Sequence, residues 1–179
     1  MMFDKEYSFR GKHSEMVIKL TGEFTLTSED GTNVKKHSLF KRNFDVYLLA
    51  PIVGFLYNRK ADIDTTPQGG STKIWADIQM NNSDDLNFNY KLIMLLDKEN
   101  EPDPEKRIDK VFRGIKNEAD EQLYNSYVLG GVEVLYENLI DKSSDYIANL
   151  YDFLETFENR YNTDVNVDDV LKMARKLSY

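Results

Sequence analysis

The chain has 179 residues, of which 41% are hydrophobic and 30% are charged, and its formal net charge is -8. This length and composition are those of one soluble globular domain. The absence of cysteine excludes a disulfide framework, a thiolate metal site and a cysteine nucleophile.

The first elements are predicted to be a short helix and a hairpin. Apolar residues recur at helical spacing over residues 12–20, with Ser14 as the N-cap. Residues 23–37 alternate on either side of an Asp-Gly turn signal at 30–31, as a β-hairpin does. The second arm has few strand-forming residues, so a polar surface loop is the alternative.

Residues 43–58 form the strongest element of the first half, because their apolar side chains fall on one broad helical stripe. Pro51 removes a backbone donor, so the helix is expected to kink there or to begin afresh. Gly54, one turn on, would let a neighbouring backbone come close. Residues 61–72 follow, with a proline, two glycines and few large side chains, and predict a flexible loop.

Helical periodicity dominates the rest of the chain. It predicts helices over residues 73–80, 84–98, 105–113, 118–140, 145–159 and 166–177. Asp103 and Pro104 form a start signal for the third of these. Gly130 and Gly131, inside the fourth, indicate either a break or a close contact between helices.

These elements predict a mainly α fold: an irregular multi-helix single domain over residues 1–160, including the loop 61–72, with room for one small N-terminal β-hairpin. Residues 161–179 are expected to form a C-terminal amphipathic helix, packed on the domain or used for association. The longest apolar run, residues 46–57, is shorter than the roughly 20 residues that span a bilayer. No apolar signal core begins the chain, so we expect a cytoplasmic protein with no membrane partner.

No catalytic constellation is evident. The two histidines, His13 and His37, lack the spacing of paired metal ligands, and no G-x-S-x-G elbow occurs. Asp62 and Asp64 suit either a polar loop or, less well, a Mg²⁺-dependent nuclease.

Glu133 and Glu137 lie one helical turn apart, but the sequence holds no E-x-x-H partner for a di-iron site, so both are expected to be exposed. We therefore predict no catalytic residue, metal or cofactor.

Charge is divided unevenly along the chain. Residues 1–60 hold ten Lys/Arg and seven Asp/Glu, whereas residues 61–179 hold thirteen and twenty-four. A contact with an anion or a nucleic acid is therefore expected in the basic N-terminal third. The candidate residues are Arg10, Lys12, His13, Lys35, Lys36, Lys41, Arg42, Arg59 and Lys60. A solvated or protein-binding face is the alternative interpretation of the same residues.

Three parts of the chain together resemble small bacterial proteins associated with the DNA-phosphorothioation (Dnd) system. They are FRGKH at 9–13, FDVYLLAPIVGFLYNRK at 44–60, and the helices at 90–97 and 107–113 with NSYVLGGVEVLYENL at 125–139. The family's pattern covers roughly residues 40–140, so FRGKH and the acidic stretch after 140 lie outside it. The matching positions are Gly54, Arg59, Lys60, Tyr127, Gly130, Gly131 and Leu135.

The resemblance implies an accessory role beside DNA-modifying or phage-defence machinery, with no catalytic residues to transfer. Together with the wide apolar helix faces, it favours a non-enzymatic protein that binds a partner protein or itself. A DNA-contacting protein that uses the basic third is the second hypothesis, and a nuclease built on Asp62 and Asp64 is the third.

Overall fold

A computed structural model describes residues 3–27, 34–66, 70–113 and 118–161. In chain order its elements are β1 (Tyr7–Arg10), α1 (Lys12–Leu20), β2 (Phe24–Thr27), β3 (Val34–His37), α2 (Asn43–Leu56), β4 (Ser71–Ile74), α3 (Ala76–Asn81), α4 (Ser83–Leu96), α5 (Pro104–Phe112), α6 (Glu118–Tyr136), the π-helix η1 (Glu137–Asp141) and α7 (Tyr146–Tyr161). The helix predicted over 166–177 and the turn at 30–31 lie outside the described residues.

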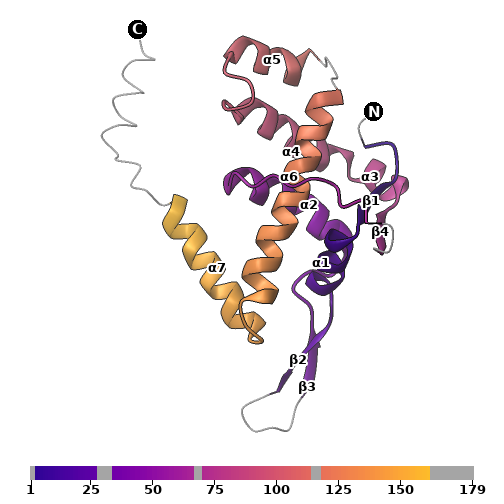
Figure 1. The fold of residues 1–179 in the computed structure, drawn as a ribbon, viewed down its shortest axis with the longest axis vertical. Helices are drawn as coiled ribbons and strands as arrows, with labels where there is room; N and C mark the ends of the chain where they lie inside the picture. The colour runs from indigo at the N-terminus through magenta and orange to yellow at the C-terminus, as the bar shows by residue number, and fades with distance from the viewer. Residues whose placement is uncertain (1–2, 28–33, 67–69, 114–117, 162–179) are drawn as a thin grey trace.

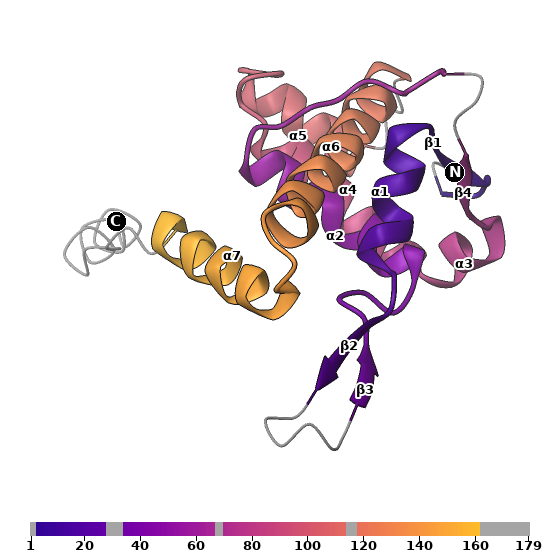
Figure 2. The same cartoon turned by 60° about the horizontal axis from the view of Figure 1, so that its bottom comes forward.

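The predicted fold class is confirmed: the described chain is mainly α, with one small hairpin near its N-terminus (Figure 1). β2 and β3 pair antiparallel, from Phe24 opposite His37 to Thr27 opposite Val34. The hairpin leaves the helical body, and α7 also diverges from it (Figure 2).

A second two-stranded sheet was not predicted. β1 pairs antiparallel with β4, so residues more than sixty positions apart in sequence lie side by side. This corrects two predictions, because Ser71 and Thr72 belong to a strand rather than to the loop 61–72, and the helix expected from Lys73 begins only at Ala76. Four-residue strands carry too few side chains to reveal themselves by alternation, and their partner is distant in sequence.

The core is organised by the crossing of α2 with α6, which runs through the centre of the molecule (Figure 1). Nine consecutive residues of α6, 127–135, are buried. At the crossing the two backbones touch: a Cβ on Gly54 would lie 2.1 Å from the Tyr127 carbonyl oxygen, and one on Gly131 would lie 1.8 Å from that of Ala50. The glycines therefore mark a close helix contact and not a break.

α2 remains one helix through Pro51, so the expectation of a fresh start at that residue is wrong. The helix is buried on most of its circumference, with Val46, Ala50 and Val53 less than 4% exposed. Burial against α6 and α4 compensates for the single hydrogen bond that the proline removes. Tertiary packing thus overrides a strong local helix breaker.

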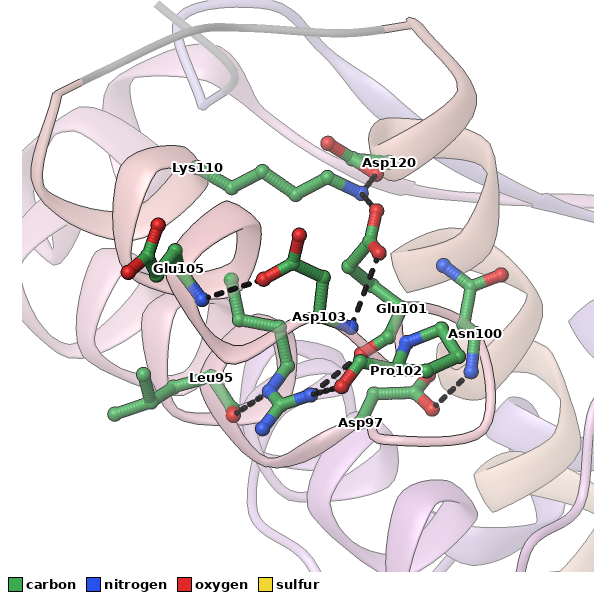
Figure 3. Close-up of polar contacts among 10 residues, drawn as sticks. Leu95, Asp97, Asn100, Glu101, Pro102, Asp103, Glu105, Lys110 and Asp120 are labelled. Atoms are coloured by element: carbon green, nitrogen blue, oxygen red, sulfur yellow. Dashed lines mark hydrogen bonds and ion pairs between the residues drawn. The ribbon is translucent and has the colours of Figure 1, made fainter.

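The turn between α4 and α5 is fixed by a buried arginine of α5 (Figure 3). The Nε–H of Arg107 donates to the Leu95 carbonyl oxygen at 2.9 Å, and its Nη1 donates to two carbonyl oxygens of the turn at 2.6 and 3.0 Å. Lys110, also on α5, donates to the buried Asp120 of α6 at 2.8 Å. The predicted cap at Asp103 is confirmed, since its Oδ1 accepts the Glu105 N–H at 2.9 Å.

The helix crossing predicts that Gly131→Ala destabilises the protein by about 3 kcal/mol or more, because the added methyl group would push the two helices apart. Gly70→Ala is the control, since its Cβ would lie an ordinary 3.6 Å from the Ser14 hydroxyl. Urea denaturation followed by circular dichroism measures both. Equal stability of the two variants would contradict backbone contact at the crossing.

Arg107→Lys should cost about 2 kcal/mol, because a lysine cannot donate to three carbonyl oxygens arranged around a planar guanidinium group. Arg113→Lys is the matched control at the C-terminal end of α5, where the arginine is exposed and, among the described residues, forms an ion pair only with Asp109. The same denaturation assay compares the variants. Hydrogen exchange should show faster opening of residues 97–103 in Arg107→Lys alone.

Candidate functional site

Two segments that are distant in sequence converge on one carboxylate, Glu133 of α6. Lys12 Nζ lies 2.7 Å from Glu133 Oε1, and His13 Nε2 lies 3.2 Å from the same oxygen. Arg59 Nε lies 3.1 Å from Oε2, and its Nη2 lies 3.0 Å from Oε1 of Glu137. We call these five residues the Glu133 cluster.

Local structure places each member of the cluster. A Cβ on Gly130 would lie 2.0 Å from the Arg59 carbonyl oxygen, so glycine lets the chain leaving α2 rest directly on α6. The Ala61 N–H donates to Ser126 of α6 at 3.0 Å and holds that segment there. Lys12 begins α1, and its backbone N–H donates to Asp64 at 2.8 Å.

Ser14 is not the N-cap of α1, because the helix begins two residues earlier, after Gly11. Its hydroxyl is buried and lies 2.7 Å from that of Thr72 on β4. The serine therefore ties the helix to the strand that the sequence did not reveal.

His13 is fully buried, and no described residue hydrogen-bonds its Nδ1. Burial lowers the pKa of His13 below its ordinary 6.5, and the attraction of Glu133 offsets only part of that effect. For Glu133 burial acts in the opposite sense and raises the pKa, but the ion pairs with Lys12 and Arg59 outweigh it and leave the pKa below 4.5. The imidazole is thus neutral and the carboxylate ionised at pH 7.

The expectation that Glu133 is exposed is wrong: it is 6% exposed, whereas Glu137 remains open to solvent. Helical periodicity alone could not show that Glu133 is buried and Glu137 exposed, because their burial depends on which distant segments cover α6. The cluster is charge-balanced, since two cations face two carboxylates. The described residues contain no group of three or more His, Asp and Glu side chains placed to hold a metal ion.

Asp64 is engaged in its own turn. It accepts hydrogen bonds from the Thr66 hydroxyl and from the backbone N–H groups of Thr66 and Lys12, and these lower its pKa to about 2. Asp62 lines a separate cavity of about 250 Å³ beside α6. Asp62 and Asp64, the two carboxylates of the nuclease hypothesis, therefore lie in different environments: Asp64 is hydrogen-bonded within a turn, and Asp62 lines a separate cavity.

The nine candidate contact residues lie in different local surroundings. Lys12, His13 and Arg59 belong to the Glu133 cluster, and Lys60 lies over the Tyr127 ring at 5.0 Å. Two others, Lys35 and Lys36, are exposed on the hairpin, and Arg10 is exposed at the end of β1.

Lys41 and Arg42, at the start of α2, line a large cavity. This cavity, of about 580 Å³, lies between α2, β4 and α3, and we call it the α2–α3 cavity. Its lining residues are Thr21, Lys41, Arg42, Asn43, Phe44, Lys73, Ile74, Trp75, Ile78, Asn81 and Asn82. The sequence alone did not indicate Lys73, because its place in the same cavity as Lys41 depends on the unpredicted strand β4.

A second hollow lies at the base of α7, between α1 and η1. It measures about 550 Å³, and we call it the α1–α7 groove. Its lining residues are Ile18, Lys19, Gly22, Glu23, Tyr136, Ile140 and Tyr146. The hairpin closes one end of it, since Phe24 packs edge-on against Tyr146 with ring centroids 5.3 Å apart.

Comparison of the chain with protein families, with curated proteins and with solved structures finds no match. Among the described residues no helix has the length and apolar character needed to cross a membrane.

The buried histidine predicts a pH-dependent stability. Below pH 6.5 the unfolded chain takes up a proton on His13 that the folded chain binds more weakly, so stability should fall as the pH falls from 7 to 5.5. The slope due to this group is at most about 1.4 kcal/mol per pH unit. His13→Gln should flatten the dependence, measured by urea denaturation at each pH.

His37→Gln, on the exposed hairpin, is the matched control and should retain the wild-type slope. The same slope in the wild type and in His13→Gln would refute the role of the buried imidazole.

Proposed function

We propose that the protein is a non-enzymatic interaction protein that binds a protein partner through α7 and the α1–α7 groove. The observation that carries the proposal is the apolar surface of α7 that the described residues leave uncovered. Tyr151 is 69% exposed and Leu154 is 52% exposed, although both are large and apolar. Isolated exposed apolar residues are ordinary, but two neighbours on one helix face are the kind of anchor that interfaces use.

The opposite side of α7 accounts for its attachment to the body. Phe153 is buried and stacks on Tyr57 with centroids 6.0 Å apart, and Phe157 follows one turn later at 6.5 Å. These contacts use one stripe of the helix, and Tyr151 and Leu154 lie outside it. α7 therefore carries more apolar surface than its attachment requires.

The α1–α7 groove extends this surface. Ile18 on its rim is 57% exposed, and the rings of Tyr136 and Tyr146 line it. Tyrosine combines a large apolar face with a hydroxyl, which makes it common in protein interfaces. No third strand of the described residues pairs with the neighbouring hairpin, so a partner's extended segment could add main-chain hydrogen bonds at its edges.

The resemblance to Dnd-associated proteins supports placing this partner in a bacterial DNA-modification or phage-defence system, within the cell. The alternative of a nuclease is not favoured, because Asp64 is committed to hydrogen bonds with Lys12 and Thr66. The alternative of one basic DNA-binding face is not favoured either, because Lys12 and Arg59 pair with Glu133.

The proposal predicts that Tyr151→Glu combined with Leu154→Glu abolishes partner retention while the chain stays folded. The tagged chain is expressed in its native host at natural levels, purified at moderate salt, and its retained proteins are identified and quantified. Light scattering of the pure chain detects self-association as the other form of partner. A partner whose retention falls at least tenfold in the double variant supports the proposal.

The matched control is Thr156→Glu combined with Asn159→Glu, which adds the same charge to exposed positions elsewhere on α7. It should retain the partner as the wild type does. A strict monomer that retains no protein, or equal loss in both double variants, would overturn the proposal.

A further inference from the structure

The α2–α3 cavity is independent of α7 and has a chemistry of its own. Three of its lining side chains are cations, Lys41, Arg42 and Lys73, and none is a carboxylate. Its volume of about 580 Å³ falls within the range of small-ligand sites. The chain as a whole is acidic, so a cavity lined by one sign of charge concentrates the opposite sign locally.

The cations differ in how far they are already neutralised. Arg42 pairs with Asp45 at 2.6 Å, and Lys73 pairs with Glu6 at 2.8 Å. Lys41 is exposed and makes no ion pair with the described residues. The cavity therefore keeps a net positive charge, with Lys41 as the group best able to contact an anion.

Trp75, the single tryptophan of the chain, stands at this cavity with 56% of its surface exposed. No aromatic ring among residues 3–27, 34–66, 70–113 and 118–161 stacks on it. Lys73 is a charged neighbour of the indole, since its Nζ lies 5.4 Å from the ring centroid. An exposed indole next to cations is the combination on which unpaired bases stack while their phosphates are neutralised.

Amide groups complete the lining. The Asn81 side chain makes no hydrogen bond to the described residues, and the Asn82 side chain uses only its Nδ2, which donates to the Ile78 carbonyl oxygen at 2.7 Å. The remaining amide donors and acceptors suit the polar edge of a base. Ile74 and Phe44 are buried beneath them and supply an apolar floor.

We propose that the α2–α3 cavity binds a nucleotide, with the base stacked on Trp75 and the phosphate contacted by Lys41 and Lys73. The base must be unpaired to reach the indole, so the source is either a free nucleotide or single-stranded nucleic acid. An acidic peptide would satisfy the cations but would leave the ring without a partner. The site is separate from the proposed protein-binding surface, so either assignment stands without the other.

Fluorescence of the single tryptophan reports directly on this site. The full chain is titrated at low salt with thymidine monophosphate, a twelve-residue oligothymidylate, inorganic phosphate and poly-glutamate. Saturable quenching by the monophosphate and the oligonucleotide identifies a mononucleotide site, and quenching by the oligonucleotide alone identifies single-stranded nucleic acid. The oligonucleotide affinity should fall as salt is raised.

Quenching by phosphate or poly-glutamate as strong as that by the nucleotides would overturn the proposal, as would no quenching by any ligand. Circular dichroism confirms that each of the variants described next is folded.

Variants test the two contacts separately, with anisotropy of a labelled oligothymidylate as the readout. Lys41→Glu and Trp75→Leu should each weaken binding at least about tenfold. Lys106→Glu, an exposed lysine on α5 away from the cavity, applies the same charge change and should leave the affinity within about twofold. Equal weakening by Lys41→Glu and Lys106→Glu would show that overall charge is responsible, and would refute the site.

Discussion

The contact of α2 with α6 at Gly54 and Gly131 is the constraint on which the rest of the structure depends. Because the two backbones touch, no side chain separates the helices, and each carries its neighbours into fixed positions. Gly130 allows the chain that leaves α2 to rest on α6, which brings the Arg59 side chain to Glu133, about one helical turn further along α6. The ion cluster is thus a consequence of the helix crossing.

The cluster in turn determines which charges remain for other molecules. Lys12 forms an ion pair with Glu133, and Arg59 forms ion pairs with Glu133 and Glu137. His13 is buried with a neutral imidazole. A buried carboxylate is costly unless it is paired, so these cations stabilise the fold before they can serve as a contact surface. Lys41, by contrast, lies outside this cluster and is exposed at the α2–α3 cavity.

Sequence patterns within a few residues correctly predicted the elements whose formation depends on neighbouring residues. The helical stripe of residues 43–58, the Asp103 cap and the hairpin all appear, because periodicity and capping act within a few residues. The glycines at 130 and 131 left two outcomes open, and packing decided between them. The β1–β4 pair, the burial of Glu133 and the meeting of Lys73 with Lys41 each need contacts between distant segments, which no local window contains.

The two proposed surfaces meet at the root of the hairpin. Thr21 lines the α2–α3 cavity, and the next residue, Gly22, lines the α1–α7 groove. Both residues belong to the link between α1 and β2. The second strand of the hairpin, β3, is followed by Lys41 at the cavity. Occupants of the cavity and of the groove would therefore contact adjacent residues of this one link. The hairpin that follows the link also reaches α7, because Phe24 packs on Tyr146. A rearrangement of the link by either occupant could thus affect the other site.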